Sequence, residues 1–294
     1  MIKRLAVIGV GLIGGSYARA LRAAGQVEEI IGCGRSRENL ERALELGVID
    51  SYSHDIGEAV EGADLVFLAV PLGAIRPAFA AMQGHLADDA IITDAGSVKG
   101  SVIRDCEAVF GSMLPNFVPG HPIAGAEQNG VEASSAGLYH NRRVILTPVC
   151  QTNESAIAVV QAAWRYCGAE VTRMFAVDHD RILAATSHLP HMLAYALVDM
   201  LARMDDREEV FRYAAGGFRD FTRIASSHPV MWRDICVANK EQLAVLVEDF
   251  AAELHQLAAS IRAGEHRQLE QIFENAKNTR DSFIDGVKPS ASPE

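Results

Sequence analysis

The sequence predicts an α/β amino-terminal part, built on a doubly wound parallel sheet, followed by an all-α carboxyl-terminal domain. Three observations lead to this prediction. Short apolar runs alternate with helical patterns through the first half, a glycine-rich turn follows the first run, and helical periodicity dominates from Asp178 to Asp285. Such strand–helix alternation is typical of a parallel sheet with helices on both faces.

The apolar runs predict strands at 4–8, 29–33, 65–70, 90–93, 143–146 and 170–173. Helical patterns between them lie at 14–24, 37–46 and 101–110. The last two strands are expected as antiparallel additions at the far edge of the sheet.

The helical half contains one long amphipathic pattern. Six apolar residues recur at spacings of four and three, which places them on one stripe of a helix: Leu243, Val247, Phe250, Leu254, Leu257 and Ile261. The stripe is interpreted as a homodimer contact, and burial within its own domain is the alternative. The predicted domains are 1–176, which binds a dinucleotide, and 177–286, for substrate binding and dimerisation. A disordered tail is expected at 287–294.

Composition excludes several classes of function. The 294 residues carry 27 Lys and Arg against 38 Asp and Glu, a formal net charge of −11. So acidic a chain is a poor general binder of nucleic acid or anionic membrane, so neither partner is expected. The apolar runs are too short to cross a bilayer. The 5 cysteines are scattered and form no Cys-x-x-Cys pair, which favours reduced thiols in the cytoplasm.

The turn after the first strand has the form G-x-G-x-x-G. Gly9, Gly11 and Gly14 provide its glycines, and Leu12 and Ile13 lie between the last two. In a strand–turn–helix context this pattern predicts a Rossmann-type dinucleotide site, because the glycines permit a tight turn and a close approach of pyrophosphate. The following helix offers its amino-terminal N–H groups to the phosphates.

The end of the second strand indicates which dinucleotide binds. NAD enzymes usually place an acidic residue about 20 residues after the fingerprint, where this chain has Gly34. Arg35, Ser36 and Arg37 follow, and such groups bind a 2′-phosphate through charge-assisted hydrogen bonds. NADP is therefore predicted over NAD, which stays possible. In the alternative, Ser36 caps the next helix and both arginines are solvated.

Three further strand ends are expected to line the cleft. Val70 and Pro71 would flank the nicotinamide, and the segment from Asp94 contributes a further cofactor contact and Ser97. Ser97 is either a functional hydroxyl or a helix cap. His121 lies between a glycine and a proline that fix its backbone, and its reference pKa of about 6.5 suits a catalytic base.

The segment 186–191 has the pattern of a helix start, with a hydroxyl cap and an early proline. His188 and His191 within it are poor metal candidates, since no glutamate follows the first histidine and no third ligand is evident. No metal is therefore expected.

Two arginines follow a Gly-Gly turn in the same half of the chain. Arg219 and Arg223 are candidates for binding a substrate carboxylate bidentately. The alternative for each is an ion pair between helices, with Asp220 or Asp234.

Six blocks of sequence resemble the prephenate/arogenate (cyclohexadienyl) dehydrogenase family of tyrosine biosynthesis. They occur in order at 7–16, 94–99, 120–125, 187–191, 217–225 and 231–234, so the resemblance covers most of the chain. The histidine–proline turn combined with the later arginine block is its most specific part. Ala126 stands where many relatives have threonine.

The resemblance implies a Rossmann domain, a helical dimerisation domain, and oxidative decarboxylation of prephenate or arogenate to 4-hydroxyphenylpyruvate or tyrosine. It implies that His121 accepts the proton of the ring hydroxyl while Ser97 holds that hydroxyl and the histidine together. Arg223 would bind a substrate carboxylate. The remaining pocket residues on this basis are His188, His191 and Gly125.

Two other functions remain as alternatives. The first is an NADP-dependent dehydrogenase of small 3-hydroxy acids. Such enzymes usually rely on a helical lysine, and from 178 to 283 only Lys240 and Lys277 are present, neither in a glycine-rich context. The second is a non-catalytic NADP-binding sensor, which would need no histidine in the cleft.

Overall fold

The computed structural model describes residues 1–125 and 128–286. Ala126 and the tail expected to be disordered, 287–294, lie outside the described residues. The chain divides into two compact units, Met1–Lys240 and Glu241–Glu294. The first unit contains the sheets and the helices that pack against them, and it holds every candidate site residue.

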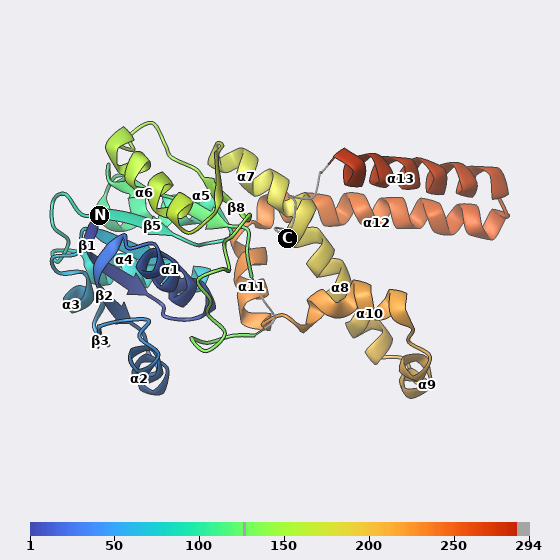
Figure 1. Cartoon of the computed structure of the whole chain (residues 1–294). Coiled ribbons are helices and arrows are strands. Elements are labelled where there is room, and N and C mark those ends of the chain that lie inside the picture. Colours follow the sequence, from blue (N-terminus) through green and yellow to red (C-terminus); the bar gives the residue numbers. More distant parts are fainter. Residues whose placement is uncertain (126–127, 287–294) are drawn as a thin grey trace. The chain divides into compact units, whose positions relative to one another are not determined.

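A six-stranded parallel sheet forms the centre of the first unit, in the order β3-β2-β1-β4-β5-β6 (Figure 1). The strands are β1 (Ile2–Ile8), β2 (Val27–Cys33), β3 (Ser51–Ser53), β4 (Leu65–Leu68), β5 (Ile91–Asp94) and β6 (Phe117–Val118). This order is that of the Rossmann fold, and it confirms the predicted fold class. The order reverses between β1 and β4, and ligands of such sheets bind outside the carboxyl ends of the strands at that point.

Alternation along the central strands separates two hydrophobic cores. In β4, Leu65 and Phe67 face one core, whereas Val66 and Leu68 face the other. Helices α1 (Leu12–Ala23) and α6 (Glu154–Tyr166) cover the first face. The second face is covered by α3 (Ile56–Val60), α4 (Ile75–Met82) and α5 (Lys99–Phe110). Because both faces are buried, these strands are continuous apolar runs in the sequence.

A second sheet of three strands has the order β7-β8-β9. It consists of β7 (Gly120–Pro122), β8 (Arg143–Leu146) and β9 (Glu170–Arg173). β8 is antiparallel to β7 and parallel to β9. The expectation that β8 and β9 extend the main sheet was therefore wrong, because the short strand β7, which carries His121, starts a separate sheet after β6.

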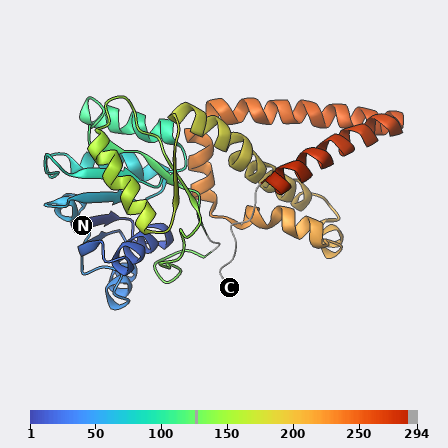
Figure 2. The ribbon, with the colours of Figure 1, turned by 45° about the horizontal axis from the view of Figure 1, so that its top comes forward.

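A run of helices follows β9 within the first unit. α7 (Ala176–Leu183) continues through a π-helical turn at Ala184–His188 into α8 (Leu189–Ala202), the yellow segment of Figures 1 and 2. The others are α9 (Arg207–Arg212), α10 (Gly216–Thr222), a 3₁₀ turn at Arg223–Ser226 and α11 (Pro229–Ala238). Pro190 occupies the predicted early helix position. The predicted hydroxyl cap was wrong, because Thr186 donates to the Ile182 carbonyl at 2.8 Å within a helix that is already under way.

The second unit begins with the second residue of α12 (Lys240–Ala263) and contains α13 (His266–Gly286), and a turn at Gly264 with φ of 66° joins the two helices. Along the predicted stripe of α12 only Leu243 is buried, and Val247, Leu254 and Ile261 are exposed. Among the described residues, no helix combines the length and the apolar character needed to span a bilayer.

Candidate active site

The glycine turn between β1 and α1 has the geometry of a dinucleotide loop. A Cβ atom on Gly9, which has φ of +100°, would lie 2.3 Å from the Ala69 carbonyl oxygen, and one on Gly14 would lie 2.1 Å from the Gly9 oxygen. Only glycine fits at these two positions. A Cβ atom on Gly11 would meet nothing within 4 Å. The space beside Gly11, at the amino terminus of α1, is therefore open to a phosphate group.

The end of β2 carries no acidic side chain. Gly34 follows the strand, Arg35 is exposed, and Ser36 accepts a hydrogen bond from the Asn39 N–H at 3.2 Å as the cap of α2 (Arg37–Glu45). Arg37 pairs with Glu41 at 2.8 Å. The capping role that the sequence offered as an alternative for Ser36 is thus present. Arg35, which precedes this cap, is exposed beside the amino terminus of α2, and anions bind well at helix amino termini.

Asn39 is a contact that sequence reasoning missed. Its Nδ2 donates to the Val10 carbonyl at 2.6 Å, and its Oδ1 accepts from the Val131 N–H at 3.1 Å. Asn39 therefore holds the glycine turn against the segment that joins β7 to β8. No motif identified it, because both of its partners are distant in sequence.

A buried ion pair lies where β5 ends. Lys99 and Asp94 are both 0% exposed and form a salt bridge. The Lys99 ammonium also donates to the Gly120 carbonyl at 2.6 Å, and Asp94 Oδ1 accepts from the Gly120 N–H at 3.0 Å. Both backbone polar groups of Gly120, the residue before His121, are held by this pair. The proposed cofactor contact of Asp94 stays a prediction, since its carboxylate is used within the protein.

His121 itself begins a chain of hydrogen bonds between side chains. Its Nδ1 lies 2.9 Å from Nε2 of His179, whose Nδ1 lies 2.8 Å from Oδ1 of Asp180. The carboxylate of Asp180 also accepts the backbone N–H groups of Lys99 and Gly100 at the start of α5, each at 2.8 Å. Sequence analysis missed His179 and Asp180, which lie on α7 without any recognisable motif.

The surroundings of His121 and His179 favour the neutral forms of both imidazole rings. Burial lowers the pKa of His121 well below 6.5, and the charges of His179, Lys99 and His188 lower it further. Burial also lowers the pKa of His179, against the opposing effect of the hydrogen bond that its Nδ1 makes to the Asp180 carboxylate. At neutral pH His121 is therefore an unprotonated imidazole that is able to accept a proton.

A second histidine pair lies on the π-helical turn and α8, against α11. His188 is 1% exposed, with its Nδ1 at 3.2 Å from Nδ2 of Asn239. His191 stacks on Trp232 with ring centroids 3.7 Å apart, and its Nδ1 donates to the Ser187 carbonyl at 2.9 Å. π-Helical turns are frequent at functional sites, and this one ends at His188.

The remaining predicted residues lie around these groups. Val70 borders the glycine turn, with its Cγ1 at 3.1 Å from a Cβ built on Gly9, and Pro71 starts the 3₁₀ turn Leu72–Ala74. Ser97 is half-buried between β5 and α5, and Gly125 is exposed. Arg223 is exposed, and its charge lowers the pKa of His191, after burial and against the hydrogen bond to Ser187. The charge of Arg223 therefore acts on His191, and the pocket that the two residues would share stays a prediction.

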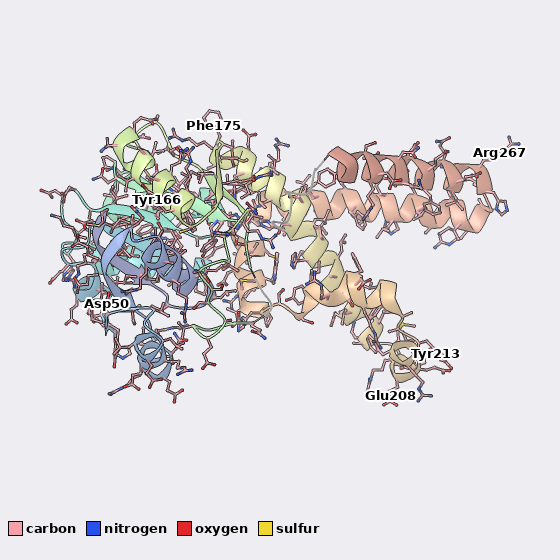
Figure 3. All side chains as sticks on the ribbon, in the orientation of Figure 1. Asp50, Tyr166, Phe175, Glu208, Tyr213 and Arg267 are labelled. Carbon is pink, nitrogen blue, oxygen red and sulfur yellow. The ribbon has the colours of Figure 1, made fainter. Side chains whose placement is uncertain are left out.

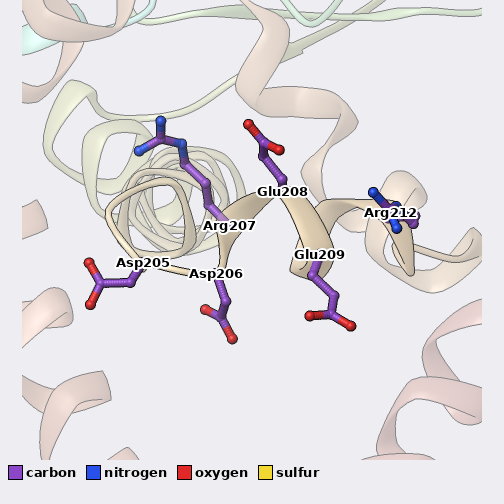
Figure 4. Close-up of a pocket in the computed structure, with 6 residues that line it drawn as sticks. All are labelled: Asp205, Asp206, Arg207, Glu208, Glu209 and Arg212. Carbon is purple, nitrogen blue, oxygen red and sulfur yellow. The ribbon is translucent and has the colours of Figure 1, made fainter.

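A hollow beside α9 lacks the chemistry of a nicotinamide site. A hollow of about 440 Å³ beside α9 is lined by charged side chains that point in different directions (Figure 4): Asp205, Asp206, Arg207, Glu208, Glu209 and Arg212. It has no apolar wall for a nicotinamide ring.

Tyr166, Phe175 and Tyr213 are exposed aromatic residues on separate segments (Figure 3). Within 1–125 and 128–286, no group of three His, Cys, Asp or Glu side chains is arranged to hold a metal ion.

Two family models match the chain. The nucleotide-binding domain of prephenate dehydrogenase matches residues 17–173, and the dimerization domain of prephenate dehydrogenase matches residues 176–275. The matches extend over both the sheet region and the helical region.

Individual proteins resemble the chain over nearly its whole length. The cyclohexadienyl dehydrogenase of Zymomonas mobilis is 40% identical over 284 residues, covering 95% of this chain and 96% of that protein. The prephenate dehydrogenase of Aquifex aeolicus, solved with hydroxyphenyl propionate and NAD+, has a TM-score of 0.89 and 37% identity, covering 96% of this chain and 99% of that one. The arogenate dehydrogenase of Synechocystis has a TM-score of 0.79 and 28% identity, covering 95% and 99%.

Proposed function

Since the chain belongs to the prephenate dehydrogenase family, we propose that it oxidatively decarboxylates prephenate or arogenate, with hydride transfer to a nicotinamide dinucleotide. The observation that carries this proposal is the hydrogen-bonded chain from Asp180 through His179 to His121, which holds the His121 imidazole near the end of β5, where burial lowers its pKa. A base at that edge meets the requirement of the reaction, which releases a hydroxyl proton as hydride leaves the ring.

The glycine turn fits a dinucleotide. Gly11 leaves open space beside the amino terminus of α1, so this helix end and Gly9 would hold the pyrophosphate. Leu12, Ile13 and Gly14 complete this contact. When bound, the cofactor supplies the hydride acceptor. Val70 and Pro71, at the neighbouring strand end, would border the nicotinamide.

NADP is the proposed cofactor, with NAD as the less favoured one. Gly34 replaces the acidic residue that binds an NAD ribose, and the exposed guanidinium of Arg35 lies beside the helix cap Ser36. A 2′-phosphate would gain charge-assisted hydrogen bonds there. The Aquifex relative was solved with NAD+, so the two cofactors need to be compared directly in this protein.

His121 and the groups around it would carry out the chemistry of the substrate. The Nε2 atom of His121 accepts the proton of the ring hydroxyl, and Ser97 holds that hydroxyl beside the imidazole. The ring then loses hydride from C4 and carbon dioxide from its carboxylate, becomes aromatic, and takes the proton back from His121 at its phenolate oxygen. Because aromatisation makes this step downhill, the protein mainly orients the ring and manages one proton.

The carboxylates of the substrate need positive or donating groups. Arg223 would bind one of them, and His191, which is held by Trp232 and Ser187, would line the same pocket with His188 and Gly125. Prephenate and arogenate differ in a keto or an amino group on the side chain. The relatives include an arogenate dehydrogenase and a cyclohexadienyl dehydrogenase, so both substrates belong in the test.

A homodimer is the proposed assembly, and the cytoplasm the proposed location. The exposed apolar residues of α12, together with the match to a dimerization domain, support the dimer. All 5 cysteines are free, which suits a reducing compartment.

An absorbance assay that crosses two substrates with two cofactors tests the proposal. Purified protein is mixed with prephenate or arogenate and with NADP or NAD, and formation of reduced nicotinamide is followed. Turnover of at least one cyclohexadienol, faster with NADP, is expected. Turnover of a small 3-hydroxy acid instead, or cofactor binding with no turnover of either cyclohexadienol, would overturn it.

A further inference from the structure

Two residues on α7, His179 and Asp180, are linked to His121 by hydrogen bonds. We propose that His179 and Asp180 are positioning residues, which fix the His121 ring in the tautomer that leaves Nε2 unprotonated. The argument rests on the proposed role of His121, but the hydrogen-bonded chain from Asp180 through His179 to His121 is a property of the folded protein itself.

The direction of the hydrogen bonds follows from the Asp180 end. Burial alone would raise the pKa of Asp180, but hydrogen bonds from His179, Gly100 and Lys99 outweigh burial and lower it, so the carboxylate is ionised. An ionised carboxylate only accepts hydrogen bonds. Nδ1 of His179 must therefore donate to Asp180.

The same reasoning passes to the next ring. A neutral imidazole that donates from Nδ1 accepts at Nε2, so Nε2 of His179 accepts, and Nδ1 of His121 carries a hydrogen and donates. In neutral His121 the lone pair is then on Nε2, on the ring edge away from His179. This is the nitrogen that a base needs to present to a substrate hydroxyl.

The Asp180 carboxylate is held rigidly, which makes it suitable as the fixed end of the chain. Its two oxygens accept the Lys99 and Gly100 N–H groups at the start of α5, each at 2.8 Å. His179 is 0% exposed, so no water competes for its ring nitrogens. A network that is satisfied and buried in this way specifies one arrangement of protons.

The charges around the chain are consistent with this assignment. The charges of His179, Lys99 and His188 lower the pKa of His121, whereas those of Asp94 and Asp180 raise the pKa of His179. When the substrate hydroxyl loses its proton, its O–H bond breaks and an N–H bond forms at Nε2 of His121. The imidazolium then donates its Nδ1 hydrogen to His179 more strongly, because it carries the positive charge.

Asp180→Asn tests the proposal because it replaces a carboxylate, which only accepts hydrogen bonds, with an amide that can also donate one. The new amide can donate to Nδ1 of His179, which turns both rings to the opposite tautomer and places a hydrogen on Nε2 of His121. Substituting the acid that orients a catalytic histidine has this effect in serine proteases. A loss of roughly 10²–10⁴-fold in kcat is expected, with little change in KM or cofactor affinity.

Asp178→Asn is the matched control. Asp178 lies two residues away on α7 and pairs at the surface with Arg181 at 3.4 Å. It is expected to turn over like the wild type. If Asp180→Asn matched this control in kcat, the proposal would be overturned.

A second pair of variants, at His179, leaves the hydrogen bonds between Asp180 and α5 in place. In His179→Gln the amide oxygen can still accept from Nδ1 of His121, whereas in His179→Leu nothing can. The glutamine variant is expected to keep at least about tenfold more kcat than the leucine variant, roughly the effect of one hydrogen bond to a charged group. Equal rates for the two variants would contradict the proposal.

A spectroscopic measurement separates this proposal from the proposed function. Nitrogen-15 correlation spectra of the imidazole rings, recorded on the full chain without substrate, report which nitrogen of His121 carries the hydrogen. Nδ1 is expected in the wild type and Nε2 in Asp180→Asn. An Nε2 hydrogen in the wild type would overturn the proposal, whether or not a cyclohexadienol is turned over. If no cyclohexadienol reacts but the tautomers are as expected, only the proposed function fails.

Discussion

The ammonium group of Lys99 lies 2.6 Å from the carbonyl oxygen of Gly120, the residue that precedes His121. Asp94, which pairs with that ammonium, accepts the N–H of the same glycine at 3.0 Å. The backbone before His121 is therefore held by a buried ion pair, and its ring is held by His179. The two sets of contacts fix the imidazole from both directions.

Lys99→Met is expected to be strongly destabilising. It leaves the Asp94 carboxylate buried without its counter-ion, which costs about 3–5 kcal/mol of the free energy of unfolding. Lys277→Met is the control, because Lys277 pairs with Asp281 at 2.8 Å on the exposed face of α13 and should change that free energy by at most about 0.5 kcal/mol. Urea denaturation measures both. Equal losses in the two variants would contradict a structural role for the buried pair.

Two alanine substitutions in the glycine turn should have different effects. Gly14→Ala places a methyl group 2.1 Å from the Gly9 carbonyl oxygen and is expected to lower the free energy of unfolding by about 1–3 kcal/mol. Gly11→Ala meets nothing within 4 Å, so it should cost less than about 1 kcal/mol. It should nevertheless weaken dinucleotide binding, since its methyl group occupies the phosphate space. Denaturation and cofactor titration together test this, and unchanged affinity in Gly11→Ala would place the pyrophosphate elsewhere.

Cofactor choice is tested at the end of β2. The double variant Arg35→Ala, Ser36→Ala should raise the Kd for NADP at least about tenfold, because it removes charge-assisted hydrogen bonds to the 2′-phosphate. The Kd for NAD should change little. Arg37→Ala is the control, since Arg37 pairs with Glu41. Unchanged NADP affinity in the double variant would show that the phosphate argument is wrong.

Acid stability should depend on His188. Burial, reinforced by the charge of His179, lowers its pKa from 6.5 to about 4. Between these values the unfolded chain binds the proton and the folded chain does not, so the free energy of unfolding falls as pH drops through this range. The contribution of His188 is up to about 3 kcal/mol. His188→Asn should flatten the pH dependence of urea denaturation between pH 7 and pH 4, whereas His255→Asn, at an exposed site on α12, should not.

The sequence predicted the parts of the fold that follow from local patterns. β8 and β9 have the predicted bounds, although only β8 contains an apolar run, 144–146. The main sheet is parallel, as the strand–helix alternation predicted. β7 was missed because it is three residues long and contains a histidine and a proline, which carry no strand signal.

The sequence predicted only those residues of the site that lie within a recognisable motif. His121 stands out between Gly120 and Pro122, but His179 joins it across 58 residues of sequence, and no periodicity encodes such a contact. Asn39 is a similar case, since it joins Val10 to Val131. Polar groups that support a site are brought together by the tertiary structure, so their contacts can be identified only in the folded protein.

The role of His121 is tested most directly by His121→Asn in a single-turnover experiment. With prephenate and NADP both saturating, the rate of nicotinamide reduction should fall by roughly 10²–10⁴-fold, the usual contribution of a general base. The Kd for NADP, measured by titration, should stay within about twofold of the wild type, because the dinucleotide contacts lie at the glycine turn. A variant that reduced the cofactor as fast as the wild type would show that another group takes the proton.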